Sequence, residues 1–257
     1  MNIEDNTILI TGGSKGIGLE MARQFLQRNN KVIITGRNEQ DLRTAEEQLV
    51  GITAIQSDVS DPDEIEKLYN RVVKDFPDLN ILINNAGVME TINLQDNNYS
   101  AKELTAEIDV NLKGTIWMNN VFVPFLKHNN NSAIINLSSG LAFVPLAIAP
   151  VYCATKAAIH SYSLSLRAQL KNTSIKVFEL APPLTGTAMI DAFDKEDMKG
   201  IAIVPASATV TAFLKGLSKD EYEIRPGLAN QLKFMSRFFP NFILKQLSKS
   251  VDRMHSG

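Results

Sequence analysis

The sequence contains a single cysteine, Cys153, among its 257 residues, so no intrachain disulfide can form. It also lacks a charge excess, because 26 lysines and arginines stand against 28 aspartates and glutamates, which leaves no bulk attraction for nucleic acid. No apolar run approaches the length of a membrane-spanning helix, and the first residues are acidic rather than basic, unlike a signal peptide. We therefore expect a cytoplasmic, globular protein from a reducing compartment.

Histidine is also scarce, and His128, His160 and His255 have no partners at the spacing of metal ligands. We therefore expect no metal site. Cys153 has no histidine placed to activate it, so we interpret it as a small packing residue rather than a nucleophile.

Short runs of β-branched residues alternate along the chain with longer helical patterns. This alternation is typical of a parallel sheet with helices on both faces, so we predict an α/β fold of the doubly wound kind. An aspartate followed by proline, Asp61-Pro62, marks the start of one helix. The expected strands span residues 7–11, 31–35, 52–56, 79–83, 133–137 and 175–180, and the expected helices span 16–29, 38–49, 61–75, 99–127 and 151–171.

The pattern changes after the sixth expected strand. A stretch rich in proline and glycine predicts a long loop, which we interpret over residues 185–204 as a substrate lid. A helix over 206–218 and a short strand over 221–225 follow. The tail, residues 228–257, has an amphipathic helical pattern interrupted by Pro240. We interpret it as an extension that covers the core or a partner subunit. Its surplus of lysine and arginine leaves a second hypothesis open, a helix on a membrane surface.

Three glycines, Gly12, Gly16 and Gly18, follow the first expected strand and open the first helix. Glycine at such positions allows a tight turn and lets a ligand approach the backbone closely. The N–H groups at the start of the helix then suit a pyrophosphate. A glycine-rich turn without a ligand is the alternative, but the strand–loop–helix setting favours a dinucleotide site.

The end of the second expected strand indicates which dinucleotide is bound. A site for NAD usually has an acidic residue there, which binds the 2′-hydroxyl of the adenosine ribose. This chain has Gly36 and Arg37 instead, with Lys15 in the glycine loop. Two cations without an acid favour a 2′-phosphate, so we predict NADP(H) in preference to NAD(H). Ordinary solvated side chains are the alternative.

A tyrosine and a lysine stand four residues apart in the helix expected over 151–171. At this spacing Tyr152 and Lys156 lie on one helix face, where the ammonium group would lower the pKa of the phenol toward the range of a general acid or base. Ser139 follows the fifth strand, at the sheet edge where parallel sheets bind ligands. We therefore predict a catalytic site there; a surface pair on an amphipathic helix is the alternative.

These residues make the sequence similar to the classical short-chain dehydrogenase/reductase family over roughly residues 5–190. The glycine segment matches the T-G-x-x-x-G-x-G pattern of the family, and Asn84-Asn85-Ala86-Gly87 matches its N-N-A-G. The resemblance implies a single Rossmann-type domain, residues 1–257, with a C-terminal helical extension. It also implies hydride transfer between a nicotinamide and a carbonyl or alcohol substrate. The residues that match the catalytic tetrad in order and spacing are Asn111, Ser139, Tyr152 and Lys156.

The resemblance implies a role for each member of the tetrad. Tyr152 would protonate the carbonyl oxygen as hydride arrives, and Lys156 would lower the tyrosine pKa and bond the nicotinamide ribose. Ser139, rather than Ser138, would hold the substrate oxygen, because it has the offset of thirteen residues from the tyrosine. Asn111 would hold a water of a proton relay; a residue that kinks its helix is the alternative.

The resemblance also implies cofactor contacts along the same sheet edge. Asp58 would contact the adenine, and Thr187 would meet the nicotinamide carboxamide. One departure is Pro183, which stands where the family usually has glycine and should stiffen the chain as it leaves the sheet. The cofactor-binding residues expected on this basis are Gly12, Ser14, Lys15, Gly16, Ile17, Gly18, Arg37, Asp58, Val59, Asn85, Ala86, Gly87, Tyr152, Lys156, Pro182, Thr185 and Thr187.

Two further hypotheses stand beside the oxidoreductase: a dinucleotide-binding regulator without turnover, and a peripheral membrane protein that attaches through the tail. The segments 181–187 and 223–227 resemble the branch of the family described as DltE-like oxidoreductases, which does not fix a substrate. Members of the family usually pair through the helices expected here at 99–127 and 151–171, so we predict a homodimer or homotetramer.

Overall fold

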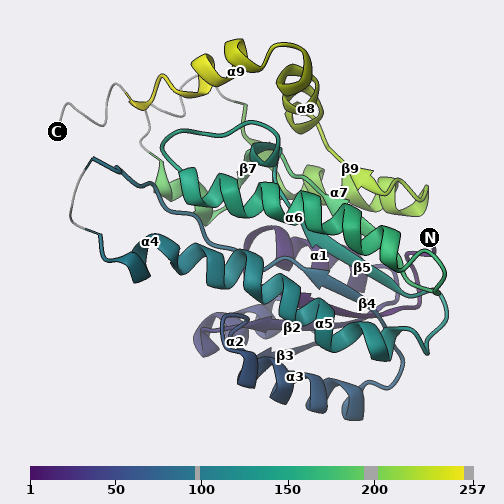
Figure 1. The fold of residues 1–257 in the computed structure, drawn as a ribbon. Helices are drawn as coiled ribbons and strands as arrows, with labels where there is room; N and C mark the ends of the chain where they lie inside the picture. The colour runs from purple at the N-terminus through teal and green to yellow at the C-terminus, as the bar shows by residue number, and fades with distance from the viewer. Residues whose placement is uncertain (96–98, 194–201, 252–257) are drawn as a thin grey trace.

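The computed structural model describes residues 1–95, 99–193 and 202–251. Within these residues, the main sheet has seven parallel strands in the order β3-β2-β1-β4-β5-β6-β9 (Figure 1). This is the doubly wound α/β arrangement that the sequence predicts. The strands are β1 (Thr7–Thr11), β2 (Lys31–Gly36), β3 (Ile52–Gln56), β4 (Leu79–Asn84), β5 (Ala133–Leu137), β6 (Lys176–Leu180) and β9 (Glu223–Ile224).

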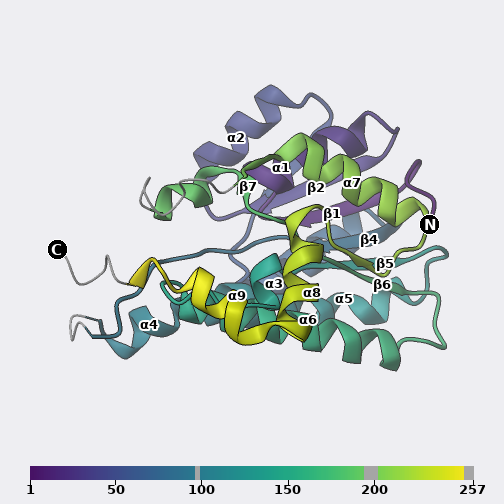
Figure 2. The same cartoon turned by 90° about the horizontal axis from the view of Figure 1, so that it is seen from above.

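Helices cover both faces of this sheet, as Figure 2 shows from above. One face carries α1 (Gly16–Leu26), α2 (Glu39–Gln48) and α7 (Ala206–Ser218). The other carries α3 (Pro62–Asp75), α5 (Thr115–Leu126) and α6 (Pro150–Gln169). The predicted start of α3 is confirmed, because the Asp61 side chain accepts from the first N–H groups of the helix and Pro62 follows it.

Strand β1 shows why the central strands are apolar throughout. Successive side chains of a strand point to opposite faces of the sheet. Ile8 and Ile10 therefore lie in the same cluster as Phe25 of α1 and Phe213 of α7, whose rings meet edge to face with centroids 6.4 Å apart. Leu9, between them, lies in the cluster on the opposite face. Both faces of the strand are thus buried.

The strand order reverses beside β1, which pairs with β2 on one side and with β4 on the other. The chain leaves β1 toward α1 on one face and leaves β4 toward α5 on the other. Doubly wound sheets bind their ligands at the carboxyl ends of the strands beside such a reversal. The fold therefore directs attention to the loops that follow β1 and β4.

The helix expected over 99–127 is interrupted in the structure. It divides into α4 (Ala101–Glu107), a π-helical turn η1 (Ile108–Gly114) and α5. The widened turn contains Asn111, whose side chain bonds the backbone of Val88 in both directions. π-helical turns of this kind frequently mark functional positions. The pattern over 99–127 predicts one continuous helix, but the kink considered as the alternative role of Asn111 lies within this π-helical turn.

The C-terminal part follows the expected order. Short strands β7 (Thr185–Gly186) and β8 (Val204–Pro205) pair outside the main sheet. The expected lid at 185–204 lies partly outside the described residues, which omit 194–201. Helices α8 (Leu228–Phe238) and α9 (Pro240–Leu247) meet at Pro240, so the predicted interruption is confirmed. The end of the tail, 252–257, also lies outside the described residues.

The helices of the described segments are all too short or too polar to cross a membrane.

Buried asparagine side chains connect β4, α5 and β5 by hydrogen bonds. Asn84 Nδ2 donates to Asn119 Oδ1 at 2.8 Å and to Asn136 Oδ1 at 2.9 Å. Asn136 Nδ2 in turn donates to Ser163 Oγ of α6 at 3.0 Å. All four side chains are buried, so these bonds replace the ones that water would otherwise make.

We expect Asn136→Ala to lower the free energy of unfolding by about 1–3 kcal/mol, because it removes one of the two acceptors of the buried Asn84 amide and the acceptor of the Asn119 amide. Urea unfolding followed by circular dichroism measures this change. Asn2→Ala is the control, since Asn2 is exposed and bonds only Glu4 and Asn6 nearby in the chain. Equal effects of the two substitutions would contradict the prediction.

Candidate active site

The four residues of the expected tetrad converge at the carboxyl edge of the sheet. Ser139 follows β5, Tyr152 and Lys156 lie one turn apart near the start of α6, and Asn111 comes from η1. All four are buried, with relative exposures between 1% and 7%. Segments far apart in the sequence therefore bring a serine, a phenol, an amine and an amide into one region.

Ser139 is the residue that influences the tyrosine most directly. Its hydroxyl lowers the pKa of the Tyr152 phenol, and it accepts from the backbone N–H of Leu141 at 3.1 Å. That bond caps the short helix η2 (Gly140–Ala142) and fixes the serine rotamer. The pair presents two hydroxyl groups at one point, as binding of a carbonyl or alcohol oxygen requires.

The neighbouring Ser138 has a different partner. Its hydroxyl donates to Oε1 of Glu179 on β6, and His160 Nδ1 lies 2.7 Å from the other oxygen of that carboxylate. Glu179 is 1% exposed, so the serine and histidine replace its hydration. The structure thus separates two adjacent serines, one toward the tyrosine and one toward a buried carboxylate. The Ser138–Glu179–His160 group carried no signal that the sequence analysis used.

Lys156 lies beside the tyrosine without contacting its hydroxyl. Its Nζ donates to the carbonyl of Leu137 at 3.0 Å and stands 5.6 Å from the centroid of the Tyr152 ring. Burial lowers the pKa of Lys156 to about 8, and the negative charge of Glu107 opposes that fall. The amine is therefore close to its titration range at neutral pH.

The pKa of Tyr152 moves in the direction opposite to the one expected from the lysine. Burial raises it to about 12, and the hydrogen bond from Ser139 opposes this rise. The expectation of a lowered pKa is wrong for the chain alone, because it considered the neighbouring charge but not the desolvation of the phenolate. At neutral pH the tyrosine carries its proton.

Asn111 holds the loop after β4 against α6. Its Nδ2 donates to the carbonyl of Val88 at 2.9 Å and to Thr155 Oγ1 at 3.2 Å, and its Oδ1 accepts from the Val88 N–H at 2.8 Å. The side chain is thus engaged by the protein itself. A Cβ placed on Gly87 would lie 3.2 Å from Asn111 Oδ1 and 3.4 Å from Lys156 Nζ, so this loop passes close to both residues.

The glycine loop folds so compactly that three of its positions leave no room for a side chain or require a positive φ angle. Gly12 and Gly16 have positive φ angles of 63° and 57°, which favour glycine. A Cβ on Gly18 would lie 2.4 Å from the Gly12 carbonyl oxygen. No side chain caps the start of α1, so its first N–H groups can donate hydrogen bonds to an anion. Thr187 lies above this loop, 3.1 Å from a Cβ built on Gly16.

Asn85 joins the glycine loop to the end of β4. Its Nδ2 donates to the carbonyls of Thr11 and Gly12 at 2.9 and 2.8 Å. The backbone N–H groups of Asn85 and Ala86 both donate to Thr11 Oγ1 at 3.0 Å. These bonds use the polar groups of Asn85 within the protein, so its contribution is to shape the loop.

The two cations expected at a 2′-phosphate lie at the ends of neighbouring strands. Each faces a carboxylate: Lys15 Nζ is 2.8 Å from Asp41, and Arg37 is 3.9 Å from Asp58. The cationic side chains are 64% and 59% exposed, so these pairs are weakly held. Ser14 lies between the strands, its Oγ 3.3 Å from a Cβ built on Gly36.

The remaining residues expected to contact the cofactor make contacts within the protein. Thr185 is buried, and its hydroxyl donates to the Pro183 carbonyl at 2.9 Å, while the Pro182 carbonyl accepts from Gly140 at 3.0 Å. Val59 is buried against Gly114, and Ile17 packs on the core. Burial raises the pKa of the Cys153 thiol to about 11, which agrees with a packing role.

Glu107 is a site residue that the sequence analysis did not find. This last residue of α4 is 2% exposed, and its Oε1 accepts from the backbone N–H of Glu90 at 2.6 Å. Its Oε2 has no hydrogen-bond partner among the described residues. Burial raises the pKa of this carboxyl, and the charge of Lys156 works in the other direction. Its spacing of four residues before Asn111 is the signal that could have identified it.

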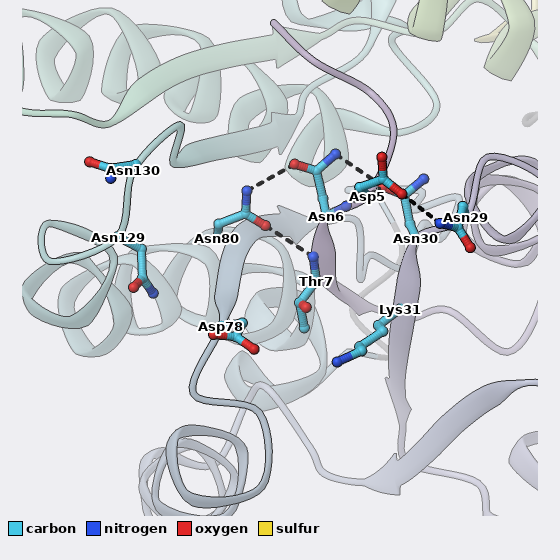
Figure 3. A pocket seen from close by; sticks show the side chains of 10 residues that line it. All are labelled: Asp5, Asn6, Thr7, Asn29, Asn30, Lys31, Asp78, Asn80, Asn129 and Asn130. Carbon is cyan, nitrogen blue, oxygen red and sulfur yellow. Dashed lines mark hydrogen bonds between the residues drawn. The ribbon is translucent and has the colours of Figure 1, made fainter.

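A polar hollow of about 570 Å³ lies at the opposite edge of the sheet, around the amino ends of the strands (Figure 3). Its amides bond one another and the backbone; Asn80, for example, binds Asn6 and the N–H of Thr7. The hollow holds none of the tetrad, so we do not assign the chemistry to it. Its lining residues are Asp5, Asn6, Thr7, Asn29, Asn30, Lys31, Asp78, Asn80, Asn129 and Asn130.

No group of three or more histidine, cysteine, aspartate or glutamate side chains within the described residues is arranged to hold a metal ion.

Comparison with known proteins gives a consistent result. The family model described as short chain dehydrogenase matches residues 6–198. The uncharacterized oxidoreductase DltE of Bacillus subtilis (strain 168) is 42% identical over 226 residues, which are 87% of this chain and 89% of that protein.

Two solved structures share the fold. A short chain dehydrogenase from Burkholderia cenocepacia J2315 in complex with NADP has a TM-score of 0.83 at 24% identity, over 96% of this chain and 99% of that one. A short chain dehydrogenase/reductase from Burkholderia phymatum in complex with NAD has a TM-score of 0.79 at 20% identity, over 96% of each chain.

The different partners of the two serines lead to a stability prediction. Ser138→Ala should lower the free energy of unfolding by about 1–3 kcal/mol, because the buried Glu179 carboxylate loses a donor. Urea unfolding measures the change. Ser165→Ala on the exposed face of α6 is the control and should change stability by less than about 0.5 kcal/mol. A Ser138 variant as stable as this control would show that the bond contributes nothing.

Proposed function

The chain belongs to the short chain dehydrogenase family, and on this premise we propose that it is an NADP(H)-dependent oxidoreductase that uses Tyr152 as its general acid and base. The observation that carries the proposal is the burial of Tyr152, Ser139 and Lys156 together at the carboxyl edge of the sheet, with Lys156 Nζ 5.6 Å from the centroid of the Tyr152 ring. The resemblance to DltE-like oxidoreductases is confirmed by the relative at 42% identity, which is itself uncharacterized and suggests no substrate. A screen of NADPH oxidation with aldehydes, ketones and quinones tests the proposal.

The residues present fit a nicotinamide dinucleotide. The uncapped start of α1 and the glycines before it suit the pyrophosphate. Because Gly87 has no side chain, the space beside Lys156 stays open, and a ribose would bind there. Thr187 lies next to Gly16 of the glycine loop, where it would contact the bound dinucleotide. When bound, the nicotinamide supplies or accepts the hydride.

The remaining chemistry belongs to the side chains of this protein. The Ser139 hydroxyl holds the substrate carbonyl oxygen next to the phenol of Tyr152. With a pKa of about 12 the tyrosine is protonated at neutral pH, so it has a proton to donate as that oxygen becomes an alkoxide. Lys156, charged below its pKa of about 8, then stabilises the phenolate that remains. Oxidation of an alcohol requires the same groups in reverse.

Removal of the phenol hydroxyl should abolish most of the turnover. Tyr152→Phe should lower kcat by roughly a hundredfold or more, the scale of a lost general acid, and leave NADPH binding intact. Tyr162→Phe removes the same hydroxyl from a half-buried tyrosine of the same helix; it is the control and should stay within about twofold. Ser139→Ala should also lower turnover, whereas Lys156→Met should weaken both turnover and NADPH binding.

Steady-state kinetics and fluorescence titration of NADPH separate these effects. A Tyr152 variant that kept most of the activity would show that another group supplies the proton. Tight NADPH binding without turnover of any substrate by the wild type would favour the dinucleotide-binding regulator instead.

The preference for NADP(H) rests on Lys15 and Arg37. A 2′-phosphate would take the place of the Asp41 and Asp58 carboxylates as the partner of these cations, with charge-assisted hydrogen bonds. The family resemblance alone does not decide, because one structural neighbour holds NADP and the other NAD.

We expect NADPH to bind more tightly than NADH by roughly tenfold or more in fluorescence titrations. Arg37→Asp should erase or reverse this preference, and Asp41→Asn should strengthen NADPH binding because it frees Lys15. Arg43→Asp is the control, since Arg43 is similarly exposed but pairs with Glu39 along α2. Equal affinities for the two cofactors in the wild type would contradict the proposal.

We also propose a homo-oligomer that pairs through α4–α5 and α6, the helices that correspond to the pairing surfaces of the family. Light scattering at micromolar concentration should give the mass of a dimer or tetramer. Leu164, an exposed leucine of α6, offers a variant: Leu164→Arg should weaken the association if α6 is part of the interface. A monomeric wild type would refute the proposal.

A further inference from the structure

The C-terminal helices expose an unusual amount of aromatic surface. Phe234, Phe238, Phe239 and Phe242 are between 54% and 59% exposed, and Leu244 is 41% exposed. Six of the twelve large apolar side chains exposed in the described residues fall within 228–244. Only Ala229 is buried in α8, and α9 buries none of its residues. The expectation that this tail covers the core therefore holds only at the start of α8.

The same helices are strongly basic. Residues 228–251 include Lys233, Arg237, Lys245 and Lys249 and no acidic residue, in a chain whose formal net charge is −2. Arg237, Lys245 and Lys249 are exposed. The aromatic side chains and the cations thus occupy one pair of helices, which lies at the outside of the molecule in both views (Figures 1 and 2).

The inner side of α8 is fixed to the body of the protein. Ala229 and Leu232 lie against Gly140, within 3.4 Å of a Cβ built there. Lys233 bonds Glu223 of β9 and stands over the Phe143 ring, 5.1 Å from its centroid. The helix is therefore held in place beside the segment that follows Ser139, and its aromatic side is left without a partner among the described residues.

We propose that α8 and α9 form a docking surface for an anionic lipid bilayer. Helices with aromatic residues on one side and lysine and arginine around them lie in the interface of membranes, with the apolar side chains among the acyl chains. Each cation near an anionic surface adds to the electrostatic attraction. Apolar patches of this kind on soluble domains mark interaction surfaces rather than ordinary exposure.

Charge decides between a bilayer and a second copy of the chain. A two-fold contact of this surface with itself would bring the three exposed cations of each copy, Arg237, Lys245 and Lys249, opposite those of the other. An anionic headgroup layer instead neutralises all of them. Because α8 adjoins the segment after Ser139, docking would also place the substrate side of the protein next to the lipid.

Sedimentation of the full chain with vesicles tests this proposal. We expect binding to phosphatidylglycerol-containing vesicles and much weaker binding to pure phosphatidylcholine, with the difference lost at high salt. The double variant Phe238→Ser/Phe242→Ser and the double variant Arg237→Gln/Lys245→Gln should each lower the partition coefficient roughly tenfold or more. Val50→Ser and Arg43→Gln, at exposed positions elsewhere, are the matched controls.

Three results would overturn the proposal. One is a wild type that binds neither kind of vesicle. Another is equal binding by the wild type and the tail variants. The third is self-association of the wild type, measured by light scattering, that disappears in the Phe238→Ser/Phe242→Ser variant, because the surface would then be an interface between copies.

A separate observation, the buried Glu107, leads to a second inference, which rests on the proposed function. We infer that Glu107 is a positioning residue whose negative charge keeps the Lys156 amine protonated. Glu107 is buried at the end of α4, which packs against α6. One turn further along, Asn111 bonds Thr155 beside Lys156, so the carboxylate lies on the side of α6 that carries the lysine. The charged and titratable groups that interact with it are Lys156, Tyr152 and Cys153 of α6 and the exposed Glu90 of the loop after β4. Lys156 is the only cation among these groups, so the buried charge acts chiefly on it.

Glu107 accepts one hydrogen bond, from the Glu90 N–H, and its Oε2 has no partner within the described part of the chain. Both carboxylate oxygens of Glu179, by contrast, have partners, Ser138 and His160. A neutral side chain could accept the same bond from Glu90 at a lower cost in free energy, because burial of a charged carboxylate destabilises the folded state. Burial alone already lowers the pKa of Lys156, and Glu107 acts against that fall. Loss of the charge should therefore release the lysine proton at lower pH.

We expect Glu107→Gln, which keeps the shape, to move the alkaline limb of carbonyl reduction lower by about one pH unit and to leave the rate below pH 6.5 nearly unchanged. A carbon-13 NMR titration of the lysine side chains should show the same displacement for Lys156. Glu90→Gln removes an exposed neighbouring carboxylate and is the control. Glu107→Asp should restore most of the wild-type profile.

An unchanged Lys156 titration in Glu107→Gln, with urea unfolding confirming a folded variant, would overturn the inference. A rate loss equal at every pH would do so too, since it indicates a structural role. A wild type that reduces no carbonyl would count against the proposed function, whereas the NMR titration decides the role of Glu107 by itself.

Discussion

The segments that follow β1 and β4 approach each other so closely that Gly12 could not carry a side chain, and the rest of the site depends on this contact. A Cβ on Gly12 would lie 2.8 Å from Cα of Ala86. Asn85 fills the remaining space with hydrogen bonds to the loop. The contact leaves the first turn of α1 accessible to an anion, and it directs the chain after β4 past Asn111 and Lys156. One backbone packing thus sets the position of both the dinucleotide site and the reacting groups.

The polar groups of the site obtain their partners from the backbone rather than from solvent. Lys156 bonds the Leu137 carbonyl, Asn111 bonds Val88, and Glu107 bonds the Glu90 N–H. Fixed partners of this kind need no reorganisation when charge moves during a reaction. The same burial displaces the proton affinities of the tyrosine and the lysine away from their values in water.

The sequence predicts most of this architecture because its signals are local. Apolar strands buried on both faces, the Asp61-Pro62 start of α3 and the Pro240 interruption each depend on neighbouring residues. The tetrad was identified from the order and spacing of its motif residues. The π-helical turn, the orphan oxygen of Glu107 and the raised pKa of Tyr152 arise from tertiary packing, which short-range patterns do not contain. Asp58 was predicted to contact the adenine, but its pairing with Arg37 and that of Lys15 with Asp41 were not predicted, for the same reason.

The edge-to-face pair of Phe25 and Phe213 has a consequence for how the chain is made. These rings come from α1 and α7, which are far apart in the sequence. Both rings are fully buried where the two helices pack together. During synthesis the ribosome releases α1 long before α7 exists, so the part of this sheet face that α7 covers stays exposed until α7 has emerged. Such an intermediate exposes apolar surface of the kind that recruits chaperones or aggregates. The nascent chain must therefore be protected from self-association up to the emergence of α7.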